Sequence, residues 1–212
     1  MDKQDLIILL ADLDAENTVR ALLDHRTTDL NIRPVTYEAK RHSMRDSGCF
    51  REAHEFVRSY LRSHAHALVI FDHDGCGKEK LTAVEIEADV ENRLHRSGWT
   101  KDNSACVVLD PELEIWTWTK SNETARILGF GPDAALLTAF LIENDLLKEG
   151  QAKPSDPKTA VEHCLRKNRK PRSARNFSDL AEHVRFEGCE DRAFIKFRRT
   201  LETWFGLSST SP

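Results

Sequence analysis

The chain has 212 residues, of which 40% are hydrophobic and 31% are charged, and its formal net charge at pH 7 is −4. This composition is ordinary for a globular protein and excludes a low-complexity chain. The small negative charge also excludes a surface that is basic throughout, so any contact with nucleic acid must depend on a local basic patch.

The five cysteines are an odd number and are widely spaced, without a Cys-x-x-Cys pair. Their spacing argues against a disulfide framework and against a zinc site. The first residues, MDKQDLIILLADLD, place acids within and after a short apolar run, unlike a signal peptide or a membrane span. We therefore expect a cytoplasmic protein without a membrane partner.

Four apolar runs in the N-terminal half of the chain predict β-strands. They lie at residues 5–11, at 30–37, in the first part of 67–77 and at 104–109. Pro34 favours an edge or irregular position for the second run, because proline donates no ladder hydrogen bond. The other runs are continuous enough to be buried on both faces, as in a parallel sheet.

Apolar residues at helical spacing follow each of these runs. The predicted helices of this region lie at residues 14–26 (with Asp14 as the N-cap), at 49–64, at 79–96 and at 111–120. Strands that alternate with helices in this way predict an α/β fold, with a mostly parallel sheet and helices on both faces.

Residues 148–157, KEGQAKPSDP, contain two prolines and a glycine and predict a linker. We place an α/β domain at residues 1–147 and a C-terminal helical extension at 158–212. The remaining predicted helices lie at residues 121–129, 132–147, 158–167, 176–185 and 190–205. The last of them has an apolar stripe that we expect to pack on the main domain.

Acidic side chains follow three of the four predicted strands. They are Asp12, Asp14 and Glu16 after the first, Asp72 and Asp74 after the third, and Glu112 and Glu114 after the fourth. Ligands of open α/β sheets bind beyond the carboxyl ends of the strands, where these side chains would meet. Like charges at short range repel, so the crowding favours a divalent cation with oxygen ligands, Mg²⁺ or Mn²⁺.

Simpler interpretations of these acids stay open at this point. An Asp-Gly sequence such as Asp74-Gly75 often only turns the chain and caps the next helix. In a helix over residues 111–120, Glu112 and Glu114 would lie on different faces, so we expect only one of them to reach the metal.

Two basic stretches and one isolated lysine are candidates for contact with nucleic-acid phosphates. The candidate side chains are Lys40, Arg41 and Arg45 in a predicted loop at residues 38–48, Lys78 after the acidic turn, and Arg169, Lys170 and Arg172 within RKNRKPRSAR. Basic loops of this kind are often no more than solvated surface.

The acidic motifs resemble those of the Toprim superfamily, which includes topoisomerases, DnaG-type primases and OLD-family nucleases. ADLDAE at residues 11–16 is similar to the Glu-Gly-x-Thr-Glu start of single-domain Toprim-like proteins of prokaryotic defence loci, with Asp12 in place of the usual Glu and Leu13 in place of the Gly. FDHDG at residues 71–75 is similar to the Asp-x-Asp motif, and PELEIW at 111–116 to a Pro-Glu-x-Glu-x-Trp stretch. The resemblance covers about the first 120 residues.

This resemblance implies a Mg²⁺- or Mn²⁺-dependent nuclease that cleaves DNA or RNA in an antiphage defence system, with other proteins of a defence operon as partners. It implies that Asp72 and Asp74 hold one metal together with Asp12 or Glu16. It also implies a supporting or second-metal role for Glu112 or Glu114.

Other families carry part of the pattern. Haloacid-dehalogenase-like phosphatases also have a strand ending in Asp-x-Asp-Gly, but there the motif normally lies on the opening strand and is followed by Thr, where this chain has Cys76. A receiver domain would use Asp12 and Asp72 but needs a Lys-Pro pair, of which we find no convincing example after a fifth strand. A scaffold or binding module of α/β fold without catalytic activity is a further alternative.

Overall fold

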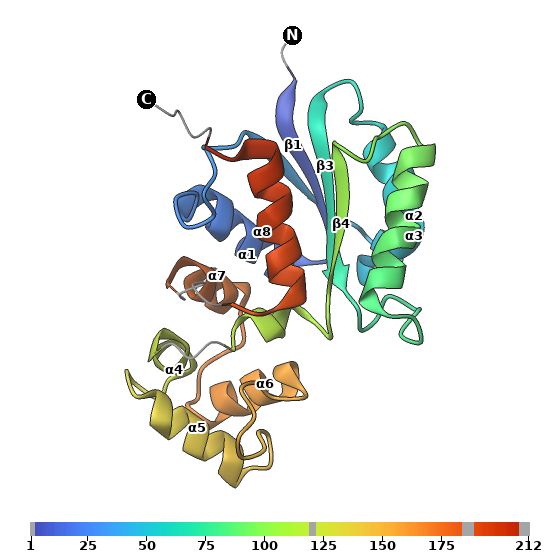
Figure 1. Cartoon of the computed structure of the whole chain (residues 1–212). Helices are drawn as coiled ribbons and strands as arrows, with labels where there is room; N and C mark the ends of the chain where they lie inside the picture. Colours follow the sequence, from blue (N-terminus) through green and yellow to red (C-terminus); the bar gives the residue numbers. More distant parts are fainter. Residues whose placement is uncertain (1–2, 119–121, 184–188, 208–212) are drawn as a thin grey trace.

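The computed structural model describes residues 3–118, 122–183 and 189–207, and these form a parallel sheet with helices on both faces (Figure 1). Within these residues the strands are β1 (Gln4–Leu10), β2 (Tyr37–Arg41), β3 (His64–Asp72) and β4 (Ser104–Leu109), in the order β2-β1-β3-β4. All three pairings are parallel. The predicted α/β class is confirmed.

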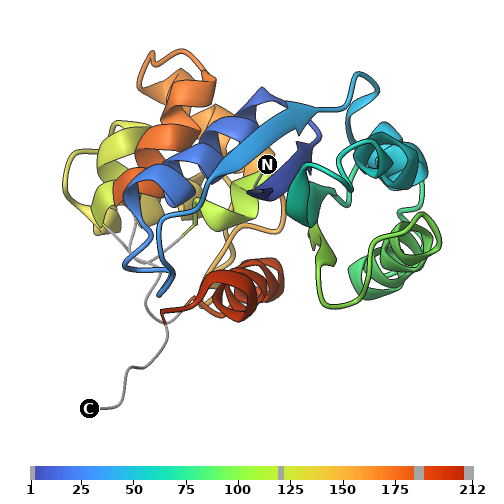
Figure 2. The same ribbon diagram turned by 90° about the horizontal axis from the view of Figure 1, so that it is seen from above.

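Helices cover the sheet in two layers (Figure 2). Helices α1, α7 and α8 share a core with one face, and α2 and α3 share a core with the other. The helical segments are α1 (Leu13–His25), α2 (Arg45–Arg58), α3 (Ala83–Arg96), the 3₁₀ turn η1 (Leu113–Trp116), α4 (Asn122–Leu128), α5 (Ala134–Glu143), α6 (Pro157–Lys167), α7 (Ala174–His183) and α8 (Arg192–Phe205).

The strand order reverses direction between β1 and β3. The chain passes from β1 to the neighbouring β2 on one side, and then crosses to β3 on the other side of β1. Loops that follow β1 and β3 therefore lead to opposite faces, which opens a crevice at the carboxyl ends of these two strands. In the register of the sheet Asp72 lies opposite Leu109, so the segments after β3 and β4 begin at the same level.

Alternation along the inner strands explains their continuous apolar sequence. In β1, Ile7 and Leu9 enter the core shared with α2 and α3, whereas Leu6, Ile8 and Leu10 enter the core shared with α1 and α8. Both faces of this strand are therefore dry, as in other parallel sheets.

The second strand differs from its prediction at residues 30–37. It begins at Tyr37, which pairs with Leu6 of β1, and ends at Arg41. The residues before it are held by Asp5, whose carboxylate accepts hydrogen bonds from the Thr36 backbone N–H (2.8 Å) and from Arg33. Lys40 and Arg41 thus belong to an edge strand and not to a loop.

Two predicted helix starts were also wrong. Asp12, and not Asp14, caps α1 by accepting a hydrogen bond from the Ala15 backbone N–H (3.0 Å). Helix α2 begins at Arg45, four residues before the predicted start at Cys49. The predicted helix at residues 111–120 is the short η1 turn, and residues 119–120 lie outside the described part of the chain.

The hydrophobic clusters do not follow the predicted boundary at residues 148–157. Helices α4, α5 and α6, which lie on both sides of that boundary, share one cluster with Trp118. Figure 1 shows them beyond the carboxyl ends of the strands. Helices α7 and α8 join the core of the sheet, as expected for the apolar stripe of α8. The last residues of the predicted extension, 208–212, lie outside the description.

No helix among the described residues has both the length and the apolar character needed to cross a bilayer.

Charged side chains close the free edge of β4. The buried Glu87 of α3 accepts a hydrogen bond from the Val108 backbone N–H (2.8 Å) and is paired with Arg192 (2.8 Å) and Lys196 (3.1 Å) of α8. The guanidinium of Arg192 donates to the Val108 carbonyl oxygen (2.7 Å). Backbone groups of an edge strand are thereby satisfied without a further strand.

Glu87→Ala should lower the free energy of unfolding by about 2–4 kcal/mol, because it leaves the buried Val108 N–H without its acceptor and removes a carboxylate partner from Arg192 and Lys196. Asp89→Ala on the exposed side of α3 is the matched control and should cost less than about 1 kcal/mol. Urea denaturation of both variants measures the difference. Equal losses would contradict a special role for Glu87.

Candidate metal centre at the carboxyl edge of the sheet

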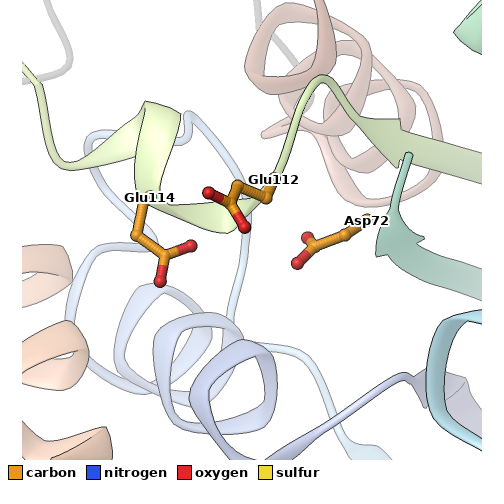
Figure 3. Close-up of side chains that lie close together, drawn as sticks. All are labelled: Asp72, Glu112 and Glu114. Atoms are coloured by element: carbon orange, nitrogen blue, oxygen red, sulfur yellow. The ribbon is translucent and has the colours of Figure 1, made fainter. Parts of the chain in front are cut away.

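Three carboxylates meet where β3 and β4 end. Asp72 is the last residue of β3, and Glu112 and Glu114 lie at the start of η1. One oxygen of each carboxylate lies within 4.8 Å of the others. Figure 3 shows the three groups pointing toward a common space. The structure thus brings together three of the side chains that the sequence singles out.

The backbone around η1 allows both glutamates to reach this space. Glu112 has an extended backbone (φ −161°, ψ 171°), and the 3₁₀ turn starts one residue later. The Leu113 backbone N–H donates to Asp72 Oδ1 (2.9 Å) and fixes the turn against the end of β3. The expectation that only one of the two glutamates would reach a metal assumed a regular helix, and the 3₁₀ turn contradicts that assumption.

Burial and like charges raise the proton affinity of the cluster. Burial raises the pKa of Asp72 well above its usual value of 3.8, and the charges of Asp46 and Glu114 add to the shift. Burial, followed by the charge of Glu114, also raises the pKa of Glu112. A cation bound at this position would relieve both effects, because it favours the charged carboxylates.

Asp46 is a member of the site that the sequence-based prediction missed. It lies in the first turn of α2, and its Oδ1 accepts a hydrogen bond from the Asp72 backbone N–H (2.9 Å). Burial raises the pKa of Asp46, and the charge of Asp12 contributes to the shift. Asp46 follows the end of β2 as the other acids follow their strands. The sequence could indicate this only if β2 were placed at Tyr37–Arg41.

Two cations from the C-terminal part of the chain neutralise part of the cluster. Lys158, at the start of α6, donates to Glu112 through its Nζ (3.1 Å) and through its backbone N–H (3.2 Å). Arg172 Nη2 lies 2.8 Å from Glu114 Oε1 and 2.9 Å from Asp14 Oδ2. Arg172, a predicted phosphate contact, is thus an internal counter-ion in this structure.

Three other predicted ligands lie apart from the common space. The Asp12 carboxylate caps α1, and Glu16 is paired with Arg20 and Arg41 (2.9 Å each). The side chain of Asp74 is 62% exposed, and the partner that the structure gives for its carboxylate is His73, at 3.9 Å.

An open groove of about 500 Å³ adjoins Asp12 on the β2 side of the crevice. The predicted phosphate contacts Lys40, Arg41 and Arg45 all line this groove. The complete lining consists of Ala11, Asp12, Leu13, Glu16, Ala39, Lys40, Arg41, His42, Ser43 and Arg45. The groove therefore offers both charge signs at the same edge of the sheet as the acidic cluster.

The other basic candidates lie elsewhere. Lys170 Nζ donates to the carbonyl oxygen of Ile127 (2.8 Å) near the end of α4, so its charge serves the helix terminus. Lys78 and Arg169 are exposed. The structure does not bring these three cations to the groove.

Comparison of the chain with protein-family models, with curated proteins and with solved structures found no match. The functional argument therefore rests on the fold and on the geometry of the site.

In the absence of divalent cations, the raised pKa of Asp72 should make the protein less stable as the pH rises above 3.8. The folded state keeps the proton of Asp72 at pH values where the unfolded chain has lost it, so the free energy of unfolding falls by up to about 1.4 kcal/mol per pH unit across that window. Asp72→Asn should remove this contribution. Denaturation from pH 4 upward in EDTA compares the two proteins, and parallel curves would contradict the shift.

Arg172→Gln should destabilise the metal-free protein by about 1–2 kcal/mol, after allowance for the partial exposure of Arg172. The same change should increase the rise in melting temperature on addition of MnCl₂, because an internal cation no longer competes for Glu114. Arg175→Gln, a highly exposed neighbour, is the control. An unchanged metal effect in Arg172→Gln would rule out competition between Arg172 and a metal.

Proposed function

We propose that the protein is a Mg²⁺- or Mn²⁺-dependent phosphodiesterase that acts on nucleic acid, as its resemblance to Toprim-like proteins implies. The observation that carries the proposal is the convergence of Asp72, Glu112 and Glu114 at the carboxyl ends of β3 and β4, on the same edge of the sheet as a groove lined by Lys40, Arg41 and Arg45. A role in antiphage defence, with partners from the same operon, rests on the resemblance alone.

The donor set fits a hard divalent cation. All three donors are carboxylate oxygens, which Mg²⁺ and Mn²⁺ prefer. The three oxygens lie within 4.8 Å of one another, whereas two ligands of one octahedral Mg²⁺ are at most roughly 4.2 Å apart, so a bound ion would draw the carboxylates closer together. A cation held by Asp72, Glu112 and Glu114 would polarise a phosphodiester and lower the pKa of a water molecule.

Neighbouring groups orient this donor set. Asp46 and the Leu113 backbone N–H hold the main chain and the carboxylate of Asp72, respectively. Lys158 holds the Glu112 carboxylate through two hydrogen bonds. Constraints of this kind reduce the rearrangement that a ligand must impose on the site.

A scaffold without catalytic activity is the second candidate function. The observation that favours it is that Lys158 and Arg172 already neutralise two of the three carboxylates. In that alternative the ion pairs are a permanent link between the sheet and the C-terminal helices, and no cation binds. Metal-dependent cleavage distinguishes the two functions.

Purified protein should cleave DNA or RNA in the presence of Mn²⁺ or Mg²⁺, and Asp72→Asn should reduce the rate more than 100-fold, because it removes a central charge of the site. Asp74→Asn should reduce the rate less than tenfold, because the Asp74 carboxylate is exposed outside the cluster. Circular dichroism checks that both variants are folded.

Single-turnover assays on labelled single strands and duplexes measure these rates. Cleavage by Asp72→Asn at the wild-type rate would exclude this site. A loss as severe in Asp74→Asn would show instead that the Asp-x-Asp motif acts as the sequence resemblance implies.

A further inference from the structure

The groove beside Asp12 combines two kinds of surface that are usually separate. Its lining has three cations, Lys40, Arg41 and Arg45, against the two carboxylates of Asp12 and Glu16. Leu13, which also lines the groove, is 45% exposed. Met44 lies between two lining residues and is 48% exposed. Cations and exposed apolar side chains thus lie side by side at the carboxyl ends of β1 and β2.

A tight turn at residues 42–45 fixes the backbone of Met44 and Arg45 next to the groove. The buried His42 accepts a hydrogen bond from the Met44 backbone N–H at its Nδ1 (3.2 Å), and its carbonyl oxygen accepts one from the Arg45 N–H (3.0 Å). Arg45 has a left-handed backbone, with φ of 48°, which is unusual for a residue with a side chain. The exposure of Met44 and Arg45 is therefore a defined feature of the fold.

The cations of the groove are available to an anionic ligand. Arg45 is exposed and forms no ion pair within residues 3–118, 122–183 and 189–207. Lys40 pairs with Glu38 (2.7 Å) and Arg41 with Glu16 (2.9 Å), but both cations are partly exposed. Pairs of this kind are weak, so phosphate groups can recruit the same cations.

A single strand matches both surfaces without being deformed. An undistorted duplex presents its phosphates and hides its bases in the stack, so it leaves Leu13 and Met44 without an apolar partner, and exposing its bases costs unstacking energy. A single strand presents phosphates together with unstacked bases, which pack against apolar side chains and Arg guanidinium planes. We propose that the groove binds single-stranded nucleic acid, with phosphates on Lys40, Arg41 and Arg45 and bases against Leu13 and Met44.

The position of the groove links this binding to the acidic cluster. Neighbouring strands are about 4.8 Å apart, so the ends of β2 and β3 are separated by roughly 10 Å along the edge of the sheet. A nucleic-acid single strand that lies across this edge would pass from the groove over Asp12 toward Asp72. Cleavage of that nucleic acid rests on the proposed phosphodiesterase function, whereas its binding in the groove does not.

Fluorescence anisotropy in EDTA tests binding without cleavage. The probes are 12-nucleotide labelled DNA and RNA single strands and the duplexes of the same sequences. Wild-type protein should bind either single strand at least tenfold more tightly than the matching duplex. Arg45→Ala should weaken binding and reduce the dependence of affinity on salt concentration, because a phosphate contact is lost.

The apolar part of the proposal has its own variants. The double variant Leu13→Ser/Met44→Ser should lose threefold to tenfold in affinity for single strands and leave the salt dependence unchanged. Leu136→Ser, which changes a 57% exposed leucine of α5 far along the chain, is the control and should bind like wild type. Thermal unfolding confirms that each variant is folded.

Equal affinity for duplex and single strand, or an unchanged affinity in the double variant, would overturn the proposal. Undetectable binding of every probe would overturn it as well. None of these results depends on catalysis, so failure of the groove and failure of the metal-dependent cleavage are separate outcomes.

Discussion

Mutual repulsion among carboxylates is the constraint around which the carboxyl edge of the sheet is built. Six acids contribute charge there: Asp12, Asp14, Asp46, Asp72, Glu112 and Glu114. Two carboxylates about 4 Å apart repel by roughly 4 kcal/mol at an effective dielectric constant near 20. A proton on Asp72 and the cations Lys158 and Arg172 compensate this excess of negative charge, and the proposed divalent metal would do so as well.

This shared charge balance ties distant parts of the chain together. Lys158 and Arg172 lie far along the sequence from the strands, and yet each reaches a glutamate beside η1. At the free edge of β4, Glu87 meets Arg192 and Lys196 of α8 in a comparable way. Ion pairs therefore attach the C-terminal helices at two places, in addition to the apolar contacts of α7 and α8 with the sheet.

The local sequence was sufficient to predict a strand where all of its residues are buried. The run SACVVL predicts β4 with the bounds that the structure has, because every one of its residues is buried. The strand β2 was misplaced because its side chains are half-buried and mostly charged, so its pairing with β1 and not its composition decides its position. Asp46 was lost with it, since a site residue can be recognised only if the preceding strand end is known.

The remaining part of the site depends on contacts between distant residues. The short η1 turn is fixed by a hydrogen bond from the Leu113 backbone N–H to Asp72. Asp72 lies 41 residues earlier in the chain, so the local sequence at residues 111–116 does not indicate this contact. In the same way, no local signal indicates that Arg172 pairs with Glu114 while its neighbour Lys170 binds the end of α4. The acidic residues at the ends of the strands could be identified from the sequence, whereas the cations that pair with them could not.

The placement of α7 and α8 on the sheet has a consequence for how the chain is made. The ribosome releases the four strands first. At that stage α1 and η1 cover only part of the face that carries Leu68 and Val107, and α7 and α8 are added to it last. The counter-ions of the acidic edge arrive equally late. A polypeptide that ended before α6 would therefore combine a partly uncovered apolar face with uncompensated negative charge, and both would destabilise the sheet until the C-terminal helices are made.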